Sequence, residues 1–197
     1  MTEPFIEIDV ERHRTYVDGR FVPSVTQILK QAGLTSPYAI DEVAAERGRV
    51  VHTLTAQDDV KKVDYRKVPK HLRGFLDAWK SYRAISGFVP DLIEHRVYHP
   101  DPEYVGTFDR YGRRNGAVLP VMLDIKTSQT GQVADVTRLQ LVAYCLAHKT
   151  GPVERMAVGL RPDGRFMVKA WGPETFQADL ARWLQIVATA KKVLEDA

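Results

Sequence analysis

Two aspartates and one lysine lie in a part of the chain whose pattern predicts β-strands. Asp109 lies in the run Val-Gly-Thr-Phe-Asp-Arg, and Asp124 and Lys126 lie in the run Leu-Asp-Ile-Lys-Thr. Residues two apart on a strand point to the same face, so Asp124 and Lys126 project together while Ile125 points into the core. If the two strands are neighbours, Asp109 converges on the same place. The sequence therefore predicts two carboxylates and one ammonium group at one edge of a sheet.

These three groups suit the hydrolysis of a phosphodiester, which adds negative charge to a phosphorus centre that is already anionic. Divalent cations offset that charge and lower the pKa of a bound water. Mg²⁺ prefers oxygen ligands and usually takes one or two carboxylates from the protein. A nearby ammonium group can orient the attacking water or stabilise the developing charge. The alternative is a structural role, because an Asp-X-Lys triplet on its own is common and buried Asp–Lys pairs also occur as plain salt bridges.

The order of the motifs resembles the RecB-type nucleases of the PD-(D/E)XK superfamily. Those proteins carry a Gly-X-X-Asp motif, an Asp/Glu-X-Lys motif and a following helix with Gln-X-X-X-Tyr, and this chain has all three in that order. The run Arg-Gly-Arg-Val-Val-His that ends at His52 resembles their upstream histidine motif, and Tyr16 to Leu29 resembles the start of the phage-like exonuclease branch. The resemblance covers residues 14 to 149 and is weak beyond them. It implies a restriction-endonuclease-like core and an Mg²⁺- or Mn²⁺-dependent deoxyribonuclease, with exonuclease action in DNA recombination, repair or phage DNA processing as the expectation.

The resemblance also implies a set of metal ligands. Asp109 and Asp124 would bind Mg²⁺ or Mn²⁺, with His52 as an additional ligand. The backbone carbonyl of Ile125 would complete the set. Glu94, on the strand before Asp109, occupies a position where some members carry an acidic residue near the metals. A hydrogen-bonded structural histidine is the alternative for His52.

Three further residues receive roles through the same resemblance. Lys126 would act on the attacking water. Gln140 and Tyr144, four residues apart and therefore on one helical face, would line the site and either touch DNA or position Lys126. A core position is the alternative for Tyr144, whereas a buried Gln140 amide needs hydrogen-bond partners. Some relatives hold an iron–sulfur cluster through four cysteines, and Cys145, the single cysteine of this chain, excludes such a cluster.

The hydrophobic pattern predicts alternating helices and strands around these motifs. We expect an α/β (α+β) fold with a mixed central sheet flanked by helices, in one nuclease domain over 1–197. An N-terminal hairpin and helices would occupy 1–90, and the motif-bearing core 91–197. The expected elements are a strand over 5–10, a hairpin over 14–22, helices from Ser24 and over 37–58 and 69–86, strands over 92–99, 104–111 and 118–126, a helix over 133–148, strands over 153–160 and 165–171, and a helix from Pro173.

Composition narrows the class of protein further. The 197 residues suffice for one domain with a core of its own, and the formal net charge of +3 neither requires nor forbids a nucleic-acid partner. No apolar run approaches the roughly 18 residues of a membrane span, and we see no secretory signal, so we expect a cytoplasmic protein. DNA is the expected partner, a separate recombinase or single-strand-binding protein is a further one, and an oligomer is compatible with the sequence. The rival interpretation is a non-catalytic DNA-binding or interaction module that retains the nuclease fold.

Overall fold

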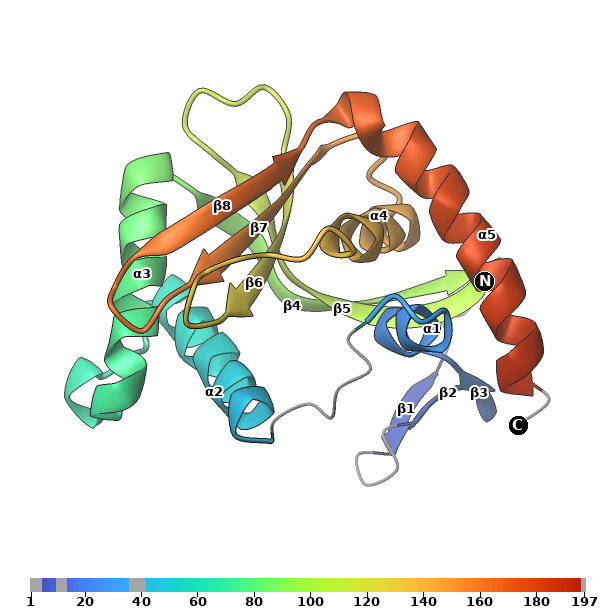
Figure 1. The fold of residues 1–197 in the computed structure, drawn as a ribbon, viewed down its shortest axis with the longest axis horizontal. Helices are drawn as coiled ribbons and strands as arrows, with labels where there is room; N and C mark the ends of the chain where they lie inside the picture. Colours follow the sequence, from blue (N-terminus) through green and yellow to red (C-terminus); the bar gives the residue numbers. More distant parts are fainter. Residues whose placement is uncertain (1–4, 10–13, 36–41, 196–197) are drawn as a thin grey trace.

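The central sheet carries most of the predicted site residues (Figure 1). The computed structural model describes residues 5–9, 14–35 and 42–195, with side chains to residue 190. The sheet has the order β4-β5-β6-β7-β8. Only β6 and β7 run parallel, and the other neighbours are antiparallel. The strands are β4 (Val89–Pro100), β5 (Glu103–Arg113), β6 (Val121–Thr127), β7 (Glu154–Leu160) and β8 (Phe166–Trp171). This mixed sheet confirms the predicted fold class.

Helices cover both faces of the sheet, as Figure 1 shows. On one face, α2 (Glu42–Asp59) and α3 (Lys70–Ser86) share a buried cluster with alternate residues of β6, among them Leu123 and Ile125. On the other face, α1 (Val25–Gln31), α4 (Thr137–His148) and α5 (Phe176–Glu195) pack on a second cluster that includes Met122. The helix α4 forms the crossover that parallel strands require between β6 and β7. Asp124 and Lys126 therefore lie on the α4 side of the sheet.

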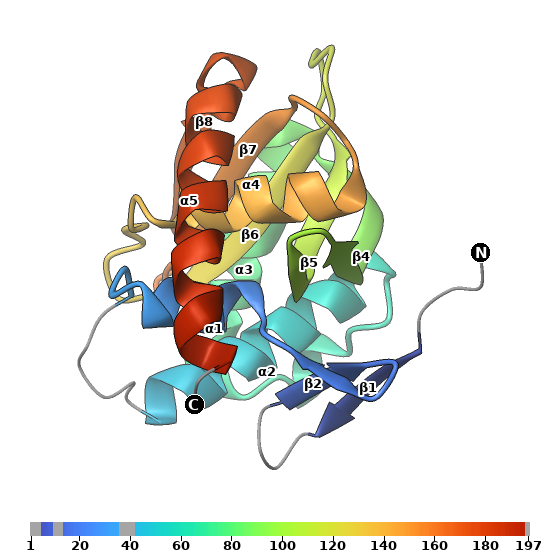
Figure 2. The same cartoon turned by 90° about the vertical axis from the view of Figure 1, so that its right-hand side faces the viewer.

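A small antiparallel sheet precedes this core and lies beside its lower edge in Figure 2. It consists of β1 (Ile6–Asp9), β2 (Arg14–Val17) and β3 (Arg20–Val22). The predicted hairpin over 14–22 is confirmed, and its turn residues Asp18 and Gly19 both have positive φ, 49° and 78°. Val17 and Val22 pack against Val105 of β5. Ser24 caps α1 through a reciprocal capping box with Gln27, so the predicted helix start is also confirmed.

Some predicted boundaries differ from the structure. The strand expected from residue 118 begins at Val121, because Val118 lies in a loop and is 93% exposed. The helix expected from residue 133 begins at Thr137, although Val133 and Val136 pack against the core and so extend the apolar pattern. The final helix is preceded by a 3₁₀ turn over Pro173–Thr175, and another such turn covers Tyr65–Lys67 before α3. The predicted starts of the helix over 37–58 and the end of the strand over 5–10 lie outside the described residues.

Among the described residues, no helix combines the length and the apolar character needed to cross a membrane.

Candidate functional site

Asp109 is fixed where the pairing of β5 with β6 ends. The two strands are paired from Gly112–Val121 to Arg110–Leu123. Beyond this last pair, the Asp109 carboxylate replaces a backbone acceptor. Its Oδ2 accepts the backbone N–H of Ile125 at 2.5 Å. This bond ties β5 to the Asp-X-Lys strand and buries the carboxylate. The convergence of Asp109 with Asp124 and Lys126 on neighbouring strands is thus as the sequence predicts.

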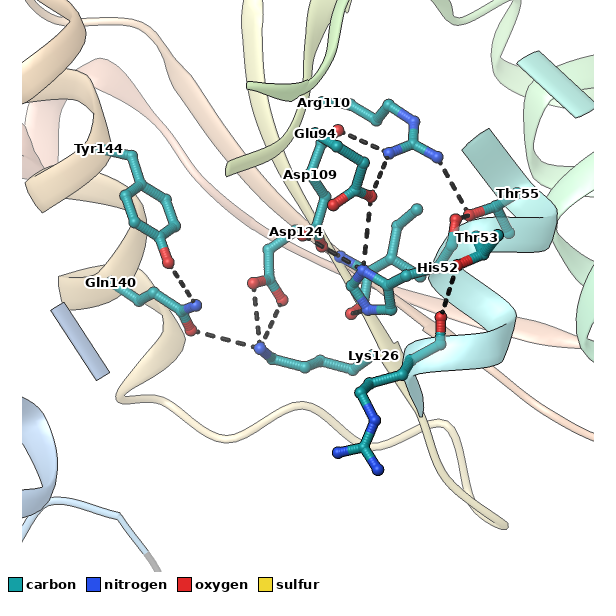
Figure 3. Close-up of polar contacts among 12 residues, drawn as sticks. His52, Thr53, Thr55, Glu94, Asp109, Arg110, Asp124, Lys126, Gln140 and Tyr144 are labelled. Atoms are coloured by element: carbon teal, nitrogen blue, oxygen red, sulfur yellow. Dashed lines mark hydrogen bonds and ion pairs between the residues drawn. The ribbon is translucent and has the colours of Figure 1, made fainter. Parts of the chain in front are cut away.

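His52, Glu94 and Asp109 come together from α2, β4 and β5 (Figure 3). The Nδ1 atom of His52 lies 3.3 Å from Asp109 Oδ1 and 3.6 Å from Glu94 Oε1. One ligand atom from each of the three residues lies within 4.8 Å of the others, which we call the His52–Glu94–Asp109 cluster. Glu94 has a φ of 46°, a left-handed conformation that is unusual for a non-glycine residue inside a strand. The cluster therefore includes the predicted acidic residue of β4.

Asp124 lies outside that cluster and begins a chain of polar contacts on the α4 side (Figure 3). Both of its carboxylate oxygens lie 3.0 Å from Lys126 Nζ. The same ammonium group donates to Gln140 Oε1 at 3.3 Å, and Gln140 Nε2 donates to the Tyr144 hydroxyl at 2.9 Å. Tyr144 is only 3% exposed. This geometry is compatible with the predicted positioning of Lys126, and the predicted contact of Gln140 and Tyr144 with DNA stays a prediction.

The two ring nitrogens of His52 face different partners. Nε2 lies 3.0 Å from the carbonyl oxygen of Ile125, whereas Nδ1 faces the two carboxylates. Burial disfavours a charged ring, but the carboxylates of Asp109 and Glu94 outweigh burial and raise the pKa of His52 to about 10. At neutral pH without a metal, a proton on Nδ1 therefore bridges to the carboxylates. The predicted ligand oxygen of Ile125 lies at the opposite nitrogen of the ring, so its ligand role stays a prediction, as does that of Asp124.

The carboxylates and the lysine also have perturbed pKa values. Burial would raise the pKa of Asp109, but the positive charges of His52 and Lys126 and the Ile125 N–H outweigh it and hold that pKa below its usual range. Burial, together with the charge of Asp109, raises the pKa of Asp124 to about 6 despite the neighbouring ammonium. Burial would lower the pKa of Lys126, yet the two aspartates raise it. At neutral pH the lysine is thus an ammonium group paired with an ionised Asp124.

Arg110 is a buried residue of this region that the sequence analysis did not single out. It directly follows the motif aspartate, and its side chain is 0% exposed. Nη1 donates to Glu94 Oε1 at 2.8 Å and to the Asp109 carbonyl at 2.6 Å, Nη2 donates to Thr55 Oγ1 at 3.0 Å, and Nε pairs with Asp59 at 2.5 Å. A basic residue inside a strand pattern, next to the motif aspartate, was the available signal. Such a residue is more often solvated, so the pattern alone does not reveal its burial.

Two neighbouring cavities lie along the polar chain. A cavity of about 520 Å³ is lined by His52, Lys126 and Gln140, together with residues of α1 and of the segment before α4. A second cavity of about 330 Å³ is lined by residues of the small sheet, α1, β4 and β5, and shares Thr26 and Gln140 with the first. The Lys126 side chain is 39% exposed. Because Lys126 lines the first cavity, a ligand in that cavity can reach its side chain.

Comparisons with known proteins add little to this geometry. No family model matches the chain, and no curated protein matches it. Among solved structures, the chain is similar to the crystal structure of SSO0001, with a TM-score of 0.38 and 15% sequence identity over 83% of this chain and 84% of that chain. A similarity of this degree leaves the function to be argued from the site itself.

Proposed function

We propose that this protein is a metal-dependent nuclease that hydrolyses phosphodiester bonds in DNA. One observation carries the proposal. Three potential metal ligands from α2, β4 and β5 meet at the point where the Asp124–Lys126 pair opens toward a cavity. Structural ion pairs alone would not explain why an ammonium group, a histidine and three carboxylates gather at a strand end beside open space. We further propose exonuclease action, in line with the motif resemblance.

His52, Glu94 and Asp109 would hold the metal ion. Their donor set of one imidazole nitrogen and carboxylate oxygens fits Mg²⁺ or Mn²⁺, and the nitrogen softens the site toward Mn²⁺. The position between Nδ1 and the two carboxylates favours positive charge, because both carboxylates lie close to the ring and raise the pKa of His52. When bound there, a divalent cation supplies charge neutralisation for the phosphate and a lowered pKa for water.

Lys126 would act on the phosphate side of the reaction. Its ammonium group is held between Asp124 and Gln140, and Gln140 is in turn held by Tyr144. This chain of contacts limits the directions in which Nζ can point. The remaining ammonium proton can donate to the attacking water or to a phosphate oxygen, where it stabilises negative charge that develops during hydrolysis. Asp124 keeps the lysine protonated and placed.

The test is cleavage of end-labelled linear DNA beside a closed circle, with Mg²⁺, Mn²⁺ or EDTA. Lys126→Ala is compared with Lys80→Ala, a matched control on α3 that also pairs with an aspartate and has a similar exposure of 43%. We expect the wild type and Lys80→Ala to degrade linear DNA only with metal, and Lys126→Ala to lose cleavage without loss of fold. An intact circle would identify an exonuclease.

Two results would contradict the proposal. Full activity of a folded Lys126→Ala variant would remove the lysine from the mechanism. Absence of cleavage by the wild type with either metal, while DNA is still bound, would favour the rival DNA-binding module.

A further inference from the structure

We propose that Arg110 is the positioning residue that holds Glu94 in the His52–Glu94–Asp109 cluster. The inference rests on the proposed metal site and assigns a role to a side chain that no substrate can reach, since Arg110 is fully buried. The inference explains how the carboxylate of Glu94 is held in position to bind a metal ion. Groups that orient metal ligands typically change metal affinity when they are replaced, although they do not touch the metal themselves.

Glu94 needs an external hold to stay in the cluster. Its φ of 46° lies in the left-handed region, which costs free energy for a side chain with a Cβ and persists only where the surroundings enforce it. The Glu94 side chain is 35% exposed, so water competes for its carboxylate. Its Oε1 atom accepts from Arg110 Nη1 at 2.8 Å and lies 3.6 Å from His52 Nδ1. The shortest contact that turns this carboxylate toward the ring is therefore the one from Arg110.

The guanidinium group of Arg110 is itself fixed by contacts with several other residues. Nε pairs with the buried Asp59, Nη2 donates to Thr55, and the guanidinium carbon lies 5.6 Å from the centre of the Trp79 ring. Nη1 also donates to the carbonyl oxygen of Asp109 at 2.6 Å. One guanidinium nitrogen thus connects the two carboxylate-bearing residues of the cluster. The planar fork of arginine makes these contacts together, whereas a lysine ammonium cannot reproduce them.

A second buried arginine provides a matched control. Arg155 is also 0% exposed, donates to Asp179 at 2.8 Å and to Thr175 at 2.6 Å, and lies 5.5 Å from the Phe176 ring. Its partners are of the same chemical kinds as those of Arg110, but they lie in the 3₁₀ turn over Pro173–Thr175 and in α5, and not at the cluster. Arg155→Lys therefore imposes a comparable structural loss and leaves the cluster untouched.

The experiment measures binding of Mn²⁺ alone to the full chain by titration calorimetry, with thermal melting of every variant. We expect Arg110→Lys to weaken Mn²⁺ binding about 10- to 100-fold. Arg155→Lys should bind as the wild type does, although both variants melt at lower temperature. In a Glu94→Ala background, Arg110→Lys should cause a much smaller loss of affinity, because the carboxylate that Arg110 positions is gone and only the contact with the Asp109 carbonyl remains to be lost.

The outcomes separate this inference from the proposed function. Mn²⁺ binding of Arg110→Lys equal to the wild type, or an equal loss in the Glu94→Ala background, overturns the positioning role while the metal site stands. Absence of Mn²⁺ binding by the folded wild type overturns the metal site, and this inference with it. If Arg110→Lys does not fold, Asp59→Asn replaces it. That variant removes the charged partner of the Arg110 Nε without touching the cluster, should weaken Mn²⁺ binding several-fold, and overturns the inference if affinity is unchanged.

Discussion

Gly106 opens the Gly-X-X-Asp motif, and replacing it by alanine tests why a side chain is excluded there. A Cβ at this position would lie 2.5 Å from Cε1 and 3.1 Å from Cδ1 of Tyr144, and 3.3 Å from Cγ2 of Val25. A normal carbon–carbon contact of about 3.5–4.0 Å requires the ring to retreat by roughly 1 Å. The ring is buried, so its neighbours must shift as well.

The expected cost of Gly106→Ala has two parts. Overpacking of a tight core typically costs about 1–3 kcal/mol. The displaced Tyr144 hydroxyl also loses or lengthens its 2.9 Å bond from Gln140, and an unsatisfied buried polar group costs about 1–3 kcal/mol. We therefore expect the free energy of unfolding to fall by about 2–6 kcal/mol, as measured by urea denaturation with the slope of the transition unchanged.

Two further variants make this reasoning refutable. Tyr144→Phe removes the hydroxyl but keeps the ring, so it should lose only the hydrogen-bond part of the stability. Gly48→Ala is the control, because a Cβ at that position would meet only Thr127 Oγ1, at an ordinary 3.8 Å. If Gly106→Ala is as stable as the wild type, the ring is not confined as described. If the DNA-cleavage rates of Gly106→Ala and Tyr144→Phe both stay at the wild-type level, the Tyr144–Gln140 chain does not position Lys126.

Two more predictions concern charged groups. Because Asp109 and Glu94 raise the pKa of His52 from 6.5 to about 10, the imidazolium stabilises the metal-free protein fully below pH 6.5, and this stability is lost as the pH rises toward 10. His52→Gln should flatten that decline in urea unfolding followed between pH 6.5 and 10, and an identical decline in the variant would refute the assignment. Arg155→Met should cost at most about 3–5 kcal/mol, because it removes the closer guanidinium partner of the buried Asp179 carboxylate and leaves only Arg138, at 3.4 Å. Arg155→Met combined with Asp179→Leu should recover part of that loss, and equal instability of the single and double variants would contradict it.

The sequence predicts the helices and strands of the site better than the contacts between them. The two-residue period of strands suffices to place Asp124 and Lys126 on one face and Ile125 in the core, and the structure confirms this. The four-residue spacing of Gln140 and Tyr144 predicts that both lie on one face of a helix, and their direct hydrogen bond confirms this. Both features follow from the periodicity of a single strand or helix, so they can be predicted from one segment of the sequence alone.

Other features depend on how distant segments meet. The bond from the Ile125 N–H to Asp109 follows from where the pairing of β5 with β6 stops, which no local pattern encodes. The left-handed conformation of Glu94 depends on the contacts around it, and the burial of Arg110 depends on Asp59 and Thr55 lying above it on α2. Apolar residues in loops also shift the predicted ends of strands. The exposed Val118 matches the strand pattern without being buried in a strand, so the predicted strand begins too early.

The short pairing between β5 and β6 also has a mechanical consequence. The strand β4 is paired with β5 along nearly its whole length, and β7 is paired with both β6 and β8 along its whole length. Between β5 and β6, which we call the seam, pairing extends only from Gly112–Val121 to Arg110–Leu123. The seam has the fewest backbone hydrogen bonds to break, so local opening of the sheet is easiest there. Glu94 and Asp109 lie on one side of it, and Asp124 and Lys126 on the other. The bond from the Ile125 N–H to Asp109 crosses this seam beyond its last backbone pair, so this one side chain fixes the spacing between the carboxylate cluster and the lysine.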